Sequence, residues 1–463
     1  MKLPDAWARA TPIFDDDNLV SFAGLAPVMA LAEQAGLSQL IDERVRFRST
    51  KVASAGVNPA GKLTSIVAGM AAGADSIDDL DVIRAGGMKQ MFGGVYAAAT
   101  LGQLLREFTH GHTLQLASVA RAHLVGLVGH TDLLPGIEAR AFVDIDSLLR
   151  PVYGHAKQGA SYGHTKIAGK QILRKGLSPL ITTISTSDGA PVVAGIRLRA
   201  GRAGSGKGAA TMVADAIRTA RAAGAVGEVL VRGDSAYGSR AVIYACLRAA
   251  ARFSVVLTKN PAVARAIADI GEDAWTPVHY PGAVEDPDTG ELISDAQVAE
   301  IEFTAFASRK NPVTARLIVR RVRDRAKTEE LFPVWRHHPF FTNSVESTPA
   351  ADLTHRRHAI IETVHSDLID GPLSGLPSGR FAANGAWAIC AAITHNLLRA
   401  AGTVIGGAHA VARGATLRRH LIAIPARLAR PARRRVLHLP EHWPWAEQWN
   451  TLWNGATGPP TTA

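Results

Sequence analysis

Hydrophobic residues recur at helical spacing along the first third of the chain. Apolar positions three or four residues apart predict two short helices within residues 19–45 and further helices over 63–72, 77–85 and 101–127, with glycine-rich turns between them. We therefore predict a helical N-terminal region over residues 1–138 that contains helix-turn-helix candidates and binds DNA. A helical bundle without any DNA contact fits the same pattern.

The pattern changes from helical to alternating at residue 141. Alternation predicts five strands, with an Asp188-Gly189 hairpin between the second and third, and helical spacing predicts two helices among the last three strands. The strands are residues 141–149, 178–185, 191–199, 227–232 and 253–258, and the helices are residues 209–223 and 240–251. The order β-β-β-α-β-α-β predicts an α/β fold with a ribonuclease H-like core.

A second β-prone stretch interrupts this alternation. Turn residues and apolar runs predict a β-rich inserted subdomain at about 260–350, after which helices are predicted over residues 353–368 and 383–398. The catalytic core would then occupy residues 139–400. Residues 401–463 would form a basic helical C-terminal region rich in Arg and Trp.

Composition narrows the class of protein. A chain of 463 residues is long enough for two or three domains, and its formal charge of +11 points to a polyanionic partner such as nucleic acid. Cys246 and Cys390 lie in apolar helical patterns, which argues against a disulfide framework. The N-terminus has no apolar signal core, and no apolar run reaches the roughly 18 residues of a membrane span. We expect a cytoplasmic protein.

The basic charge is concentrated near the C-terminus. Between Asp370 and Glu441 the chain has ten arginines and no acidic residue. Such a single-sign stretch predicts contacts with DNA phosphates, and a solvated basic face is the alternative. The candidate phosphate-binding residues here are Arg418, Arg419, Arg433, Arg434 and Arg435.

The stretch A-F-V-D-I-D-S, residues 141–147, places two carboxylates in an apolar strand. Asp144 and Asp146 are two positions apart, so both point to one face of the strand. That face must hold cations, meet water or pair with a nearby Arg, because unpaired carboxylates are costly to bury. Two acids about 7 Å apart along a strand are not both central to one ion pair. We favour Asp146 as the metal ligand and assign Asp144 a supporting role.

Three acids occupy comparable places in the predicted core. Asp146 ends the first strand, Asp234 follows the fourth, and Glu362 lies in the helix after the insertion. The first and fourth strands are neighbours in a ribonuclease H-like sheet, so their acids converge. Three carboxylates from separate elements suit a pair of divalent ions that activates water or phosphate. Magnesium is the expected cofactor, and manganese is an acceptable substitute.

Histidines accompany Glu362 at helical spacing. His355, His358, Glu362 and His365 line one helical face, which would also suit a zinc site. The face lacks two histidines four residues apart with a glutamate between them, so zinc is the weaker interpretation.

A glycine-rich stretch resembles a nucleotide-binding loop. G-R-A-G-S-G-K-G, residues 201–208, has Gly208 where a phosphate-binding loop has the Ser or Thr that holds magnesium. The preceding hairpin is also not a parallel βαβ unit. We expect a basic turn near DNA, acting through Arg202 and Lys207.

Several motifs in fixed order resemble one known family. V-D-I-D-S, Y-G-H-A-K-Q-G-A-S-Y-G-H, L-S-P-L, V-R-G-D-S-A-Y, F-F-T-N, H-R-R-H-A-I-I-E, L-P-S-G-R-F-A-A-N-G-A-W and V-L-H-L-P-E-H-W-P-W are similar to motifs of the group-one DDE insertion-sequence transposases, family thirteen-eighty, related to the insertion-sequence-four superfamily. The resemblance extends over nearly the whole chain and is densest over residues 141–398.

The resemblance implies a Mg²⁺-dependent DNA transposase acting on terminal inverted repeats and target DNA as a synaptic homodimer. Carried over by motif, the catalytic acids are Asp146, Asp234 and Glu362. The superfamily's helix signature of Tyr, Arg, Glu and Lys falls on His355, His358, Glu362 and Ile369. The phosphate-gripping Arg and Lys are therefore replaced, and a DNA-hairpin intermediate stays open.

Other residues of that helix are candidates for gripping the DNA backbone. His355, Arg356, Arg357, His358 and His365 are the DNA-binding candidates of this segment. Two other functions fit the same residues: a catalytically silent DNA-binding protein descended from a transposase, and a ribonuclease H-like nuclease without strand transfer.

Overall fold

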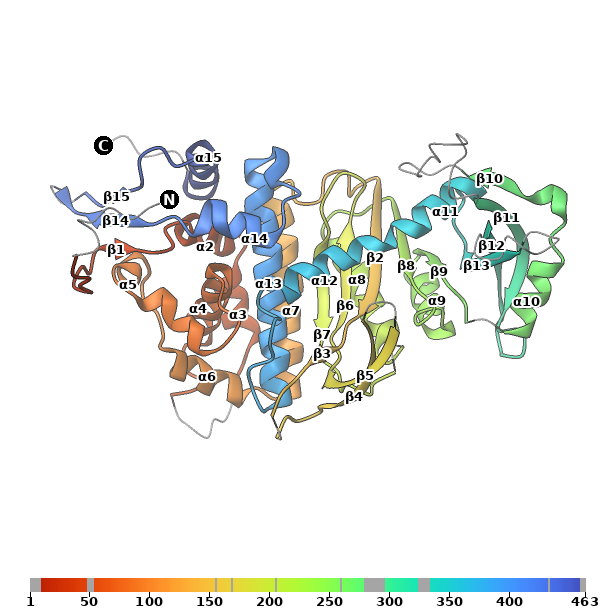
Figure 1. Ribbon diagram of the computed structural model, residues 1–463, viewed down its shortest axis with the longest axis horizontal. Coiled ribbons are helices and arrows are strands. Elements are labelled where there is room, and N and C mark those ends of the chain that lie inside the picture. The colour runs from red at the N-terminus through yellow and green to blue at the C-terminus, as the bar shows by residue number, and fades with distance from the viewer. Residues whose placement is uncertain are drawn as a thin grey trace.

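The chain forms three parts in a row, as the computed structural model shows (Figure 1). At one end lie the N-terminal helices together with the C-terminal segments; the central sheet and its helices follow, and strands from residues 296–342 form the other end. The structure describes residues 10–47, 54–154, 156–167, 170–204, 206–258, 260–278, 296–323, 334–431 and 434–458.

A nine-stranded mixed sheet organises the molecule, in the order β10-β11-β12-β13-β9-β8-β2-β6-β7. β2 runs parallel to β8, and β8 runs parallel to β9, whereas β6 is antiparallel to both β2 and β7. The strands of this half are β2 (Arg140–Ser147), β6 (Leu180–Ser185), β7 (Val192–Arg197), β8 (Glu228–Gly233) and β9 (Arg252–Val255). Helix α8 (Ala209–Ala222) packs on β2, and the apolar residues of β2 are buried.

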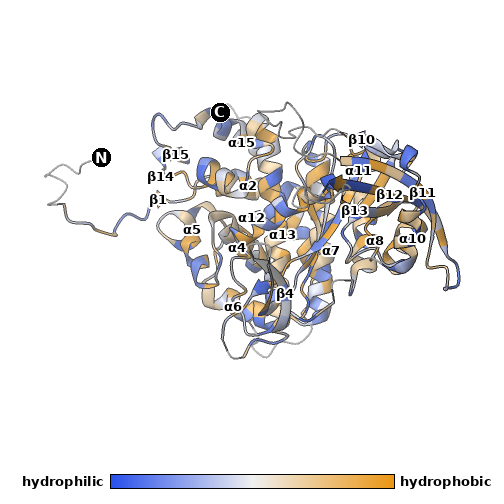
Figure 2. Cartoon of the chain, turned by 45° about the vertical axis from the view of Figure 1, so that its right-hand side comes forward, coloured by the Kyte–Doolittle hydropathy of each residue, from blue (hydrophilic) through white to orange (hydrophobic). Residues whose placement is uncertain are grey.

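The strands expected in an inserted subdomain extend this same sheet. β13 pairs with β9 through Phe341 opposite Val255 and Thr342 opposite Ser254. The added strands are β10 (Thr276–Val278), β11 (Ala296–Ala305), β12 (Val313–Arg323) and β13 (Trp335–Thr342), preceded by helix α10 (Pro261–Ala268). Figure 2 shows that β12 and β13 themselves contain many hydrophobic residues. Because β13 pairs with β9, backbone hydrogen bonds join the added strands to the core sheet.

Two long helices lie side by side against β7. They are α7 (His110–His130) and α13 (Phe381–Ile405), while α8 (Ala209–Ala222) packs on β6 and β7 beside α9 (Arg240–Arg248). Among the described residues, α13 alone is long and apolar enough to cross a membrane, but 83% of its apolar window is buried inside the fold. α13 is thus the central core helix between the sheet and the N-terminal helices.

The N-terminal helices follow the predicted pattern with one break. The single helix expected over residues 101–127 is two helices, because Thr109 ends one and caps α7 by accepting a hydrogen bond from the His112 N–H. The other helical segments are α2 (Leu25–Gln34), α3 (Leu37–Arg44), α4 (Pro59–Ala72), a 3-10 helix (Asp78–Arg84), α5 (Met88–Met91) and α6 (Ala98–Glu107).

The two ends of the chain meet. β1 (Leu19–Val20) pairs with β14 (Ala426–Ala429), which pairs with β15 (Val436–His438). The remaining C-terminal helices are α14 (Gly414–Leu417), a π-helix (Arg418–Ile422) and α15 (Ala446–Thr457), which packs against α2. The basic C-terminal segment is therefore anchored on the N-terminal helices.

Two local features near the sheet's end differ from expectation. A small sheet of β3 (Arg150–Pro151), β5 (Lys170–Leu177) and β4 (Ser161–Ile167) fills a stretch with no predicted strands. The helix expected over residues 353–368 is divided into α11 (Thr348–Arg356), a 3-10 turn (Arg357–Ile360) and α12 (Ile361–Ile369). The break puts Glu362 in the first turn of a new helix.

Candidate active site

Two of the predicted acids lie at neighbouring strand ends. β2 and β8 run parallel, with Ile145 opposite Gly233, so Asp146 and Asp234 follow at the same edge of the sheet. The Asp146 carboxylate accepts a hydrogen bond from the Ser147 N–H at 2.6 Å, and the Asp234 carboxylate accepts one from the Ala236 N–H at 2.9 Å. These local bonds hold the Asp146 carboxylate at the last residues of β2 and the Asp234 carboxylate in the turn after β8.

The third acid, Glu362, comes from α12, which packs against β2. The negative charges of Asp234 and Glu362 both act on Asp146, and together with burial they raise the pKa of Asp146 to about 7. Burial is the larger cause, because desolvation disfavours the ionised carboxyl. The structure thus brings all three predicted acids into one electrostatic site.

The donor set of this site fits a divalent cation. Three carboxylates from separate elements offer oxygen ligands, and a cation would offset their mutual repulsion. Within the described residues, no group of three His, Cys, Asp or Glu side chains lies close enough to enclose an ion. The fit to a cation therefore rests on the chemistry of the three carboxylates and on their electrostatic influence on one another.

Asp144 has a different environment from Asp146. Its carboxylate is 1% exposed and accepts two hydrogen bonds of 2.7 Å from the Arg232 guanidinium. Arg232 also donates to the Thr354 carbonyl in α11 and lies 4.2 Å from the Phe142 ring centroid. This buried ion pair connects β2, β8 and α11, so Asp144 helps to hold α11, the helix before α12, against the sheet.

The residues of this segment that were expected to grip DNA are divided between core and surface. His355 is 6% exposed; its ring stacks on Phe340 at 4.2 Å, and its Nδ1 lies 2.9 Å from the Ser254 hydroxyl. His355 is therefore a core residue and not, as expected, part of the surface. The His358 ring contacts the His355 carbonyl, whereas Arg357 is exposed and Arg356 is half-buried.

His365 lies beside the acids rather than on the surface. It is 8% exposed, and its Nδ1 is 3.8 Å from the Asp146 carboxylate. Burial lowers the pKa of His365 to about 4, which keeps the ring neutral. The sequence had placed this residue among the DNA-binding candidates.

Two further residues of the site have no counterpart in the sequence prediction. Arg199, 6% exposed, follows β7, and its positive charge acts on Asp146. Tyr237 is fully buried next to Asp146 and Asp234, and burial raises the pKa of its hydroxyl. Tyr237 ends the V-R-G-D-S-A-Y motif, so its proximity to Asp234 in sequence was the available signal.

The glycine-rich loop of residues 201–208 packs beside the acids. Arg199 donates hydrogen bonds to the Gly204 and Lys207 carbonyls. The loop thus points carbonyl oxygens at the Arg199 guanidinium, whereas a phosphate-binding loop points backbone N–H groups at an anion. The side chains of Arg202 and Lys207 are exposed. The loop therefore presents two exposed basic side chains, and its contact with DNA stays a prediction.

The C-terminal arginines also differ in their surroundings. Arg418 is half-buried and donates to the Ala71 carbonyl, and burial lowers its pKa. Arg419, Arg434 and Arg435 are exposed, and Arg433 lies outside the described residues. Arg418 thus anchors the C-terminal segment to α4, while three neighbours are accessible to a ligand.

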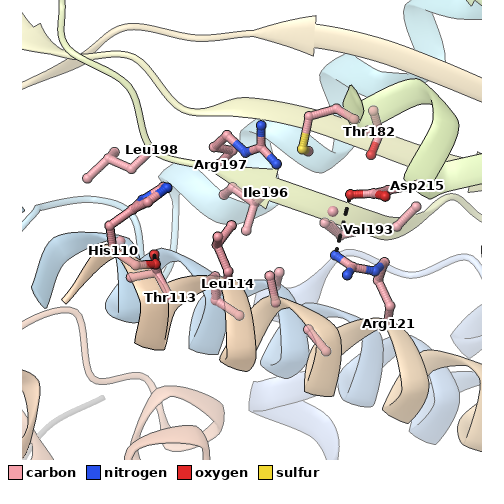
Figure 3. A pocket seen from close by; sticks show the side chains of 18 of the residues that line it. His110, Thr113, Leu114, Arg121, Thr182, Val193, Ile196, Arg197, Leu198 and Asp215 are labelled. Carbon is pink, nitrogen blue, oxygen red and sulfur yellow. Dashed lines mark hydrogen bonds and ion pairs between the residues drawn. The ribbon is translucent and has the colours of Figure 1, made fainter. Parts of the chain in front are cut away.

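A separate cavity of about 190 Å³ lies between α7, α13 and β7. Figure 3 shows its largely apolar wall, with Arg121 of α7 facing Asp215 of α8 at 3.8 Å. Leu114, Ile196 and Val193 contribute to the lining. This cavity contains none of the three acids and is distinct from the candidate active site.

One protein-family model matches nearly the whole chain. A family model described as transposase DDE domain, group 1, matches residues 9–455. No curated protein matches the chain. The family match agrees with the resemblance inferred from the motifs and covers all three acids.

Proposed function

Because the chain belongs to the family of transposases with a group 1 DDE domain, we propose that it excises an insertion sequence and joins it to target DNA. The observation that supports this proposal is the placement of Asp146 and Asp234 at the ends of the parallel strands β2 and β8, with α12, which carries Glu362, packed against β2. We further assign the chain to insertion-sequence family thirteen-eighty on its motifs. Its proposed place of action is the cytoplasm.

The sheet topology supports a ribonuclease H-like catalytic core. The five strands β7-β6-β2-β8-β9 are adjacent in this order, and β2, β8 and β9 are mutually parallel. This arrangement puts the ends of β2 and β8 at one edge, facing α12. We propose residues 139–400 as the catalytic core, with residues 1–138 and 401–463 as DNA-binding regions.

The proposed chemistry is phosphodiester cleavage followed by strand transfer. Asp146, Asp234 and Glu362 would hold two divalent ions, with Mg²⁺ as the physiological ion and Mn²⁺ as a substitute. When bound, such ions stabilise negative charge on the phosphodiester and lower the pKa of the attacking water or 3′ hydroxyl. Arg199 contributes positive charge beside Asp146 and fixes the loop that carries Arg202 and Lys207.

The proposed partner is double-stranded DNA, both terminal inverted repeats and target. The charge of +11 and the exposed Arg357, Arg419, Arg434 and Arg435 support contacts with phosphates. Two ends must be cut together, so we propose a homodimer in the synaptic complex.

The test is end cleavage and strand transfer by purified protein with Mg²⁺. Asp146→Asn, Asp234→Asn and Glu362→Gln are each expected to lower cleavage by at least about 10³-fold, because each removes charge stabilisation in the transition state. Asp188→Asn, in the exposed hairpin at the opposite end of β6, is the matched control and is expected to cleave normally.

Two outcomes would contradict the proposal. A wild-type protein that binds element ends but never cleaves them would be a DNA-binding protein without catalysis. A protein that cleaves but never joins a pre-cut end to plasmid DNA would be a nuclease.

A further inference from the structure

His365 has an unusual position for a residue of a carboxylate site. α12 places it three residues after Glu362, so both side chains lie on the same side of the helix. Its Nδ1 is 3.8 Å from the Asp146 Oδ2 atom. One short helix therefore contributes a carboxylate and an imidazole to the edge where Asp146 lies.

Neither ring nitrogen of His365 has a hydrogen bond among the described residues. The 3.8 Å separation from Asp146 is too long for a hydrogen bond, and the buried Nε2 has no partner in the described part of the chain. A buried polar atom without a partner is unfavourable, because it has lost its hydrogen bonds to water. With the residue 8% exposed, contact with a DNA phosphate would also require the ring to leave its pocket.

A shared ion would account for this arrangement. Two donor atoms that bind one ion through bonds of about 2.1 Å lie about 3.0–3.6 Å apart, close to the observed separation. A Glu-x-x-His pair on one helix is also a recurring way to supply an oxygen and a nitrogen ligand to a metal in a helical site. His365 thus has the distance, the burial and the spacing of a ligand.

We propose that His365 is a nitrogen ligand of the ion held by Asp146, and that the site consequently prefers Mn²⁺ to Mg²⁺. Magnesium prefers oxygen ligands, whereas imidazole binds transition-metal ions. The inference rests on the proposed function, since it requires the acids to bind a divalent ion. It reverses the expected order of affinity, so that Mn²⁺ binds more tightly than Mg²⁺. It also gives His365 a role separate from DNA binding.

The test measures metal binding by the full-length protein with MnCl₂ or MgCl₂ alone, independently of DNA cleavage. Calorimetry is expected to show wild type binding Mn²⁺ at least about 10-fold more tightly than Mg²⁺, and electron spin echo spectra of bound Mn²⁺ should contain a ¹⁴N coupling. His365→Ala should lose about 10–100-fold in Mn²⁺ affinity and lose the ¹⁴N coupling. His365→Asp should bind both ions without that coupling and with a smaller preference for Mn²⁺.

His123→Ala is the matched control. His123 is 1% exposed on α7 and also has a buried Nε2 without a hydrogen-bond partner in the described residues, so it reproduces the loss of a buried imidazole away from the acids. Its Mn²⁺ affinity and ¹⁴N coupling should equal those of wild type. Thermal unfolding confirms that each compared variant is folded.

The outcomes separate this inference from the proposed function. Mn²⁺ binding that Asp146→Asn abolishes, but that has no ¹⁴N coupling sensitive to His365, would overturn the His365 assignment and leave the acid site intact. A wild-type protein with no Mn²⁺ or Mg²⁺ binding dependent on Asp146 would overturn the metal site itself and, with it, the proposed function.

Discussion

Asp144 and Asp146 point to the same face of β2 but meet opposite charges. Asp144 lies opposite Arg232 in the parallel register, and the two form a buried ion pair. Asp146 lies one pleat further, past the end of β8, where Asp234 and Glu362 are its charged neighbours. Two positions along one strand thus separate a structural carboxylate from a candidate ligand.

Breaking the Asp144 pair is expected to destabilise the fold. Asp144→Asn leaves the 2% exposed Arg232 guanidinium without a counter-charge, which typically costs about 3–5 kcal/mol in the free energy of unfolding. Urea denaturation measures this loss. The double variant Asp144→Asn, Arg232→Met should recover much of it, because both buried charges are gone.

The opposite result would change the assignment of Asp144. If Asp144→Asn is as stable as wild type yet cleaves no DNA, Asp144 acts in catalysis and the ranking of the two aspartates is wrong.

Asp146 is expected to make the metal-free protein less stable as the pH rises. Its pKa in the folded protein, about 7, lies above the ordinary value of 3.8, so folding favours the protonated carboxyl. The contribution of the protonated Asp146 carboxyl to the free energy of unfolding is complete below about pH 4 and is lost as the pH rises through 7. The full pKa difference corresponds to about 4 kcal/mol, which solvent screening of the one-third exposed side chain reduces to about 1–2 kcal/mol.

Unfolding between pH 5 and 8 with EDTA tests this prediction. Asp146→Asn should lose less stability than wild type over this range, because it has no ionised carboxyl near Asp234 and Glu362. Adding MnCl₂ at pH 8 should stabilise wild type but not Asp146→Asn. Parallel pH curves for the two proteins would contradict the raised pKa.

At the scale of elements, α12 is held from two sides. One side contributes Glu362 and His365 to the edge of β2, and the other carries the buried Asp367. Asp367 pairs with Arg413, and its Oδ2 lies 3.9 Å from His395 Nδ1 on α13. Its charge also acts on Arg399 and Arg418. The C-terminal segment and the core helix therefore position the helix of the third acid.

Removing Asp367 should loosen α12 and reduce cleavage. Asp367→Ala removes the ion pair with the exposed Arg413 and the negative charge that acts on the buried Arg399, with an expected cost of about 1–3 kcal/mol and a loss of cleavage although all three acids remain. Asp370→Asn is the control, since Asp370 at the end of the same helix is exposed and should change stability by less than about 0.5 kcal/mol. Urea denaturation and a cleavage assay measure both. Normal cleavage by a folded Asp367→Ala would show that α12 does not need this anchor.

Periodicity and turn residues predicted most elements of the core. β2, β6, β7, β8, α8 and α9 lie within a few residues of their expected ranges, because each combines a regular apolar period with a Gly, Asn or Asp boundary. β4 and β5 were missed because polar residues interrupt their alternation. Their packing depends instead on close backbone approach: a Cβ at Gly163 would lie 2.3 Å from the Gly201 carbonyl oxygen.

The site could be predicted only as far as local sequence determines it. The three acids were found because they follow strands or lie in the helix after the insertion. His355 could not be recognised as a core residue, since Phe340 and Ser254, which bury it, come from distant strands. Arg418 likewise resembles its exposed neighbour Arg419 in sequence, and only the contact with Ala71 distinguishes them.

At the scale of the whole molecule, the arginines of the basic C-terminal segment fall into two groups, those that interact within the fold and those that are exposed. Arg399, Arg413 and Arg418 act within the fold through Asp367, and Arg427 lies 3.4 Å from Asp16. Arg419, Arg434 and Arg435 of the segment are exposed, and the last two immediately precede β15, whose place at one end of the molecule Figure 1 shows. The acid-free stretch is therefore not a uniform phosphate-binding surface. Only its exposed arginines are expected to contact DNA phosphates.

Replacing those exposed arginines should weaken the salt dependence of DNA binding. Each arginine that neutralises a phosphate adds about 0.9 to the slope of log affinity against log salt concentration, so Arg419→Ala, Arg434→Ala and Arg435→Ala together should reduce the slope by up to about 2.7. Fluorescence anisotropy with a duplex at several salt concentrations measures it. Arg248→Ala, an exposed arginine on α9, should leave the slope unchanged. An unchanged slope in the triple variant would place the phosphate contacts elsewhere, and the next candidates would be Arg202 and Lys207 beside the acids.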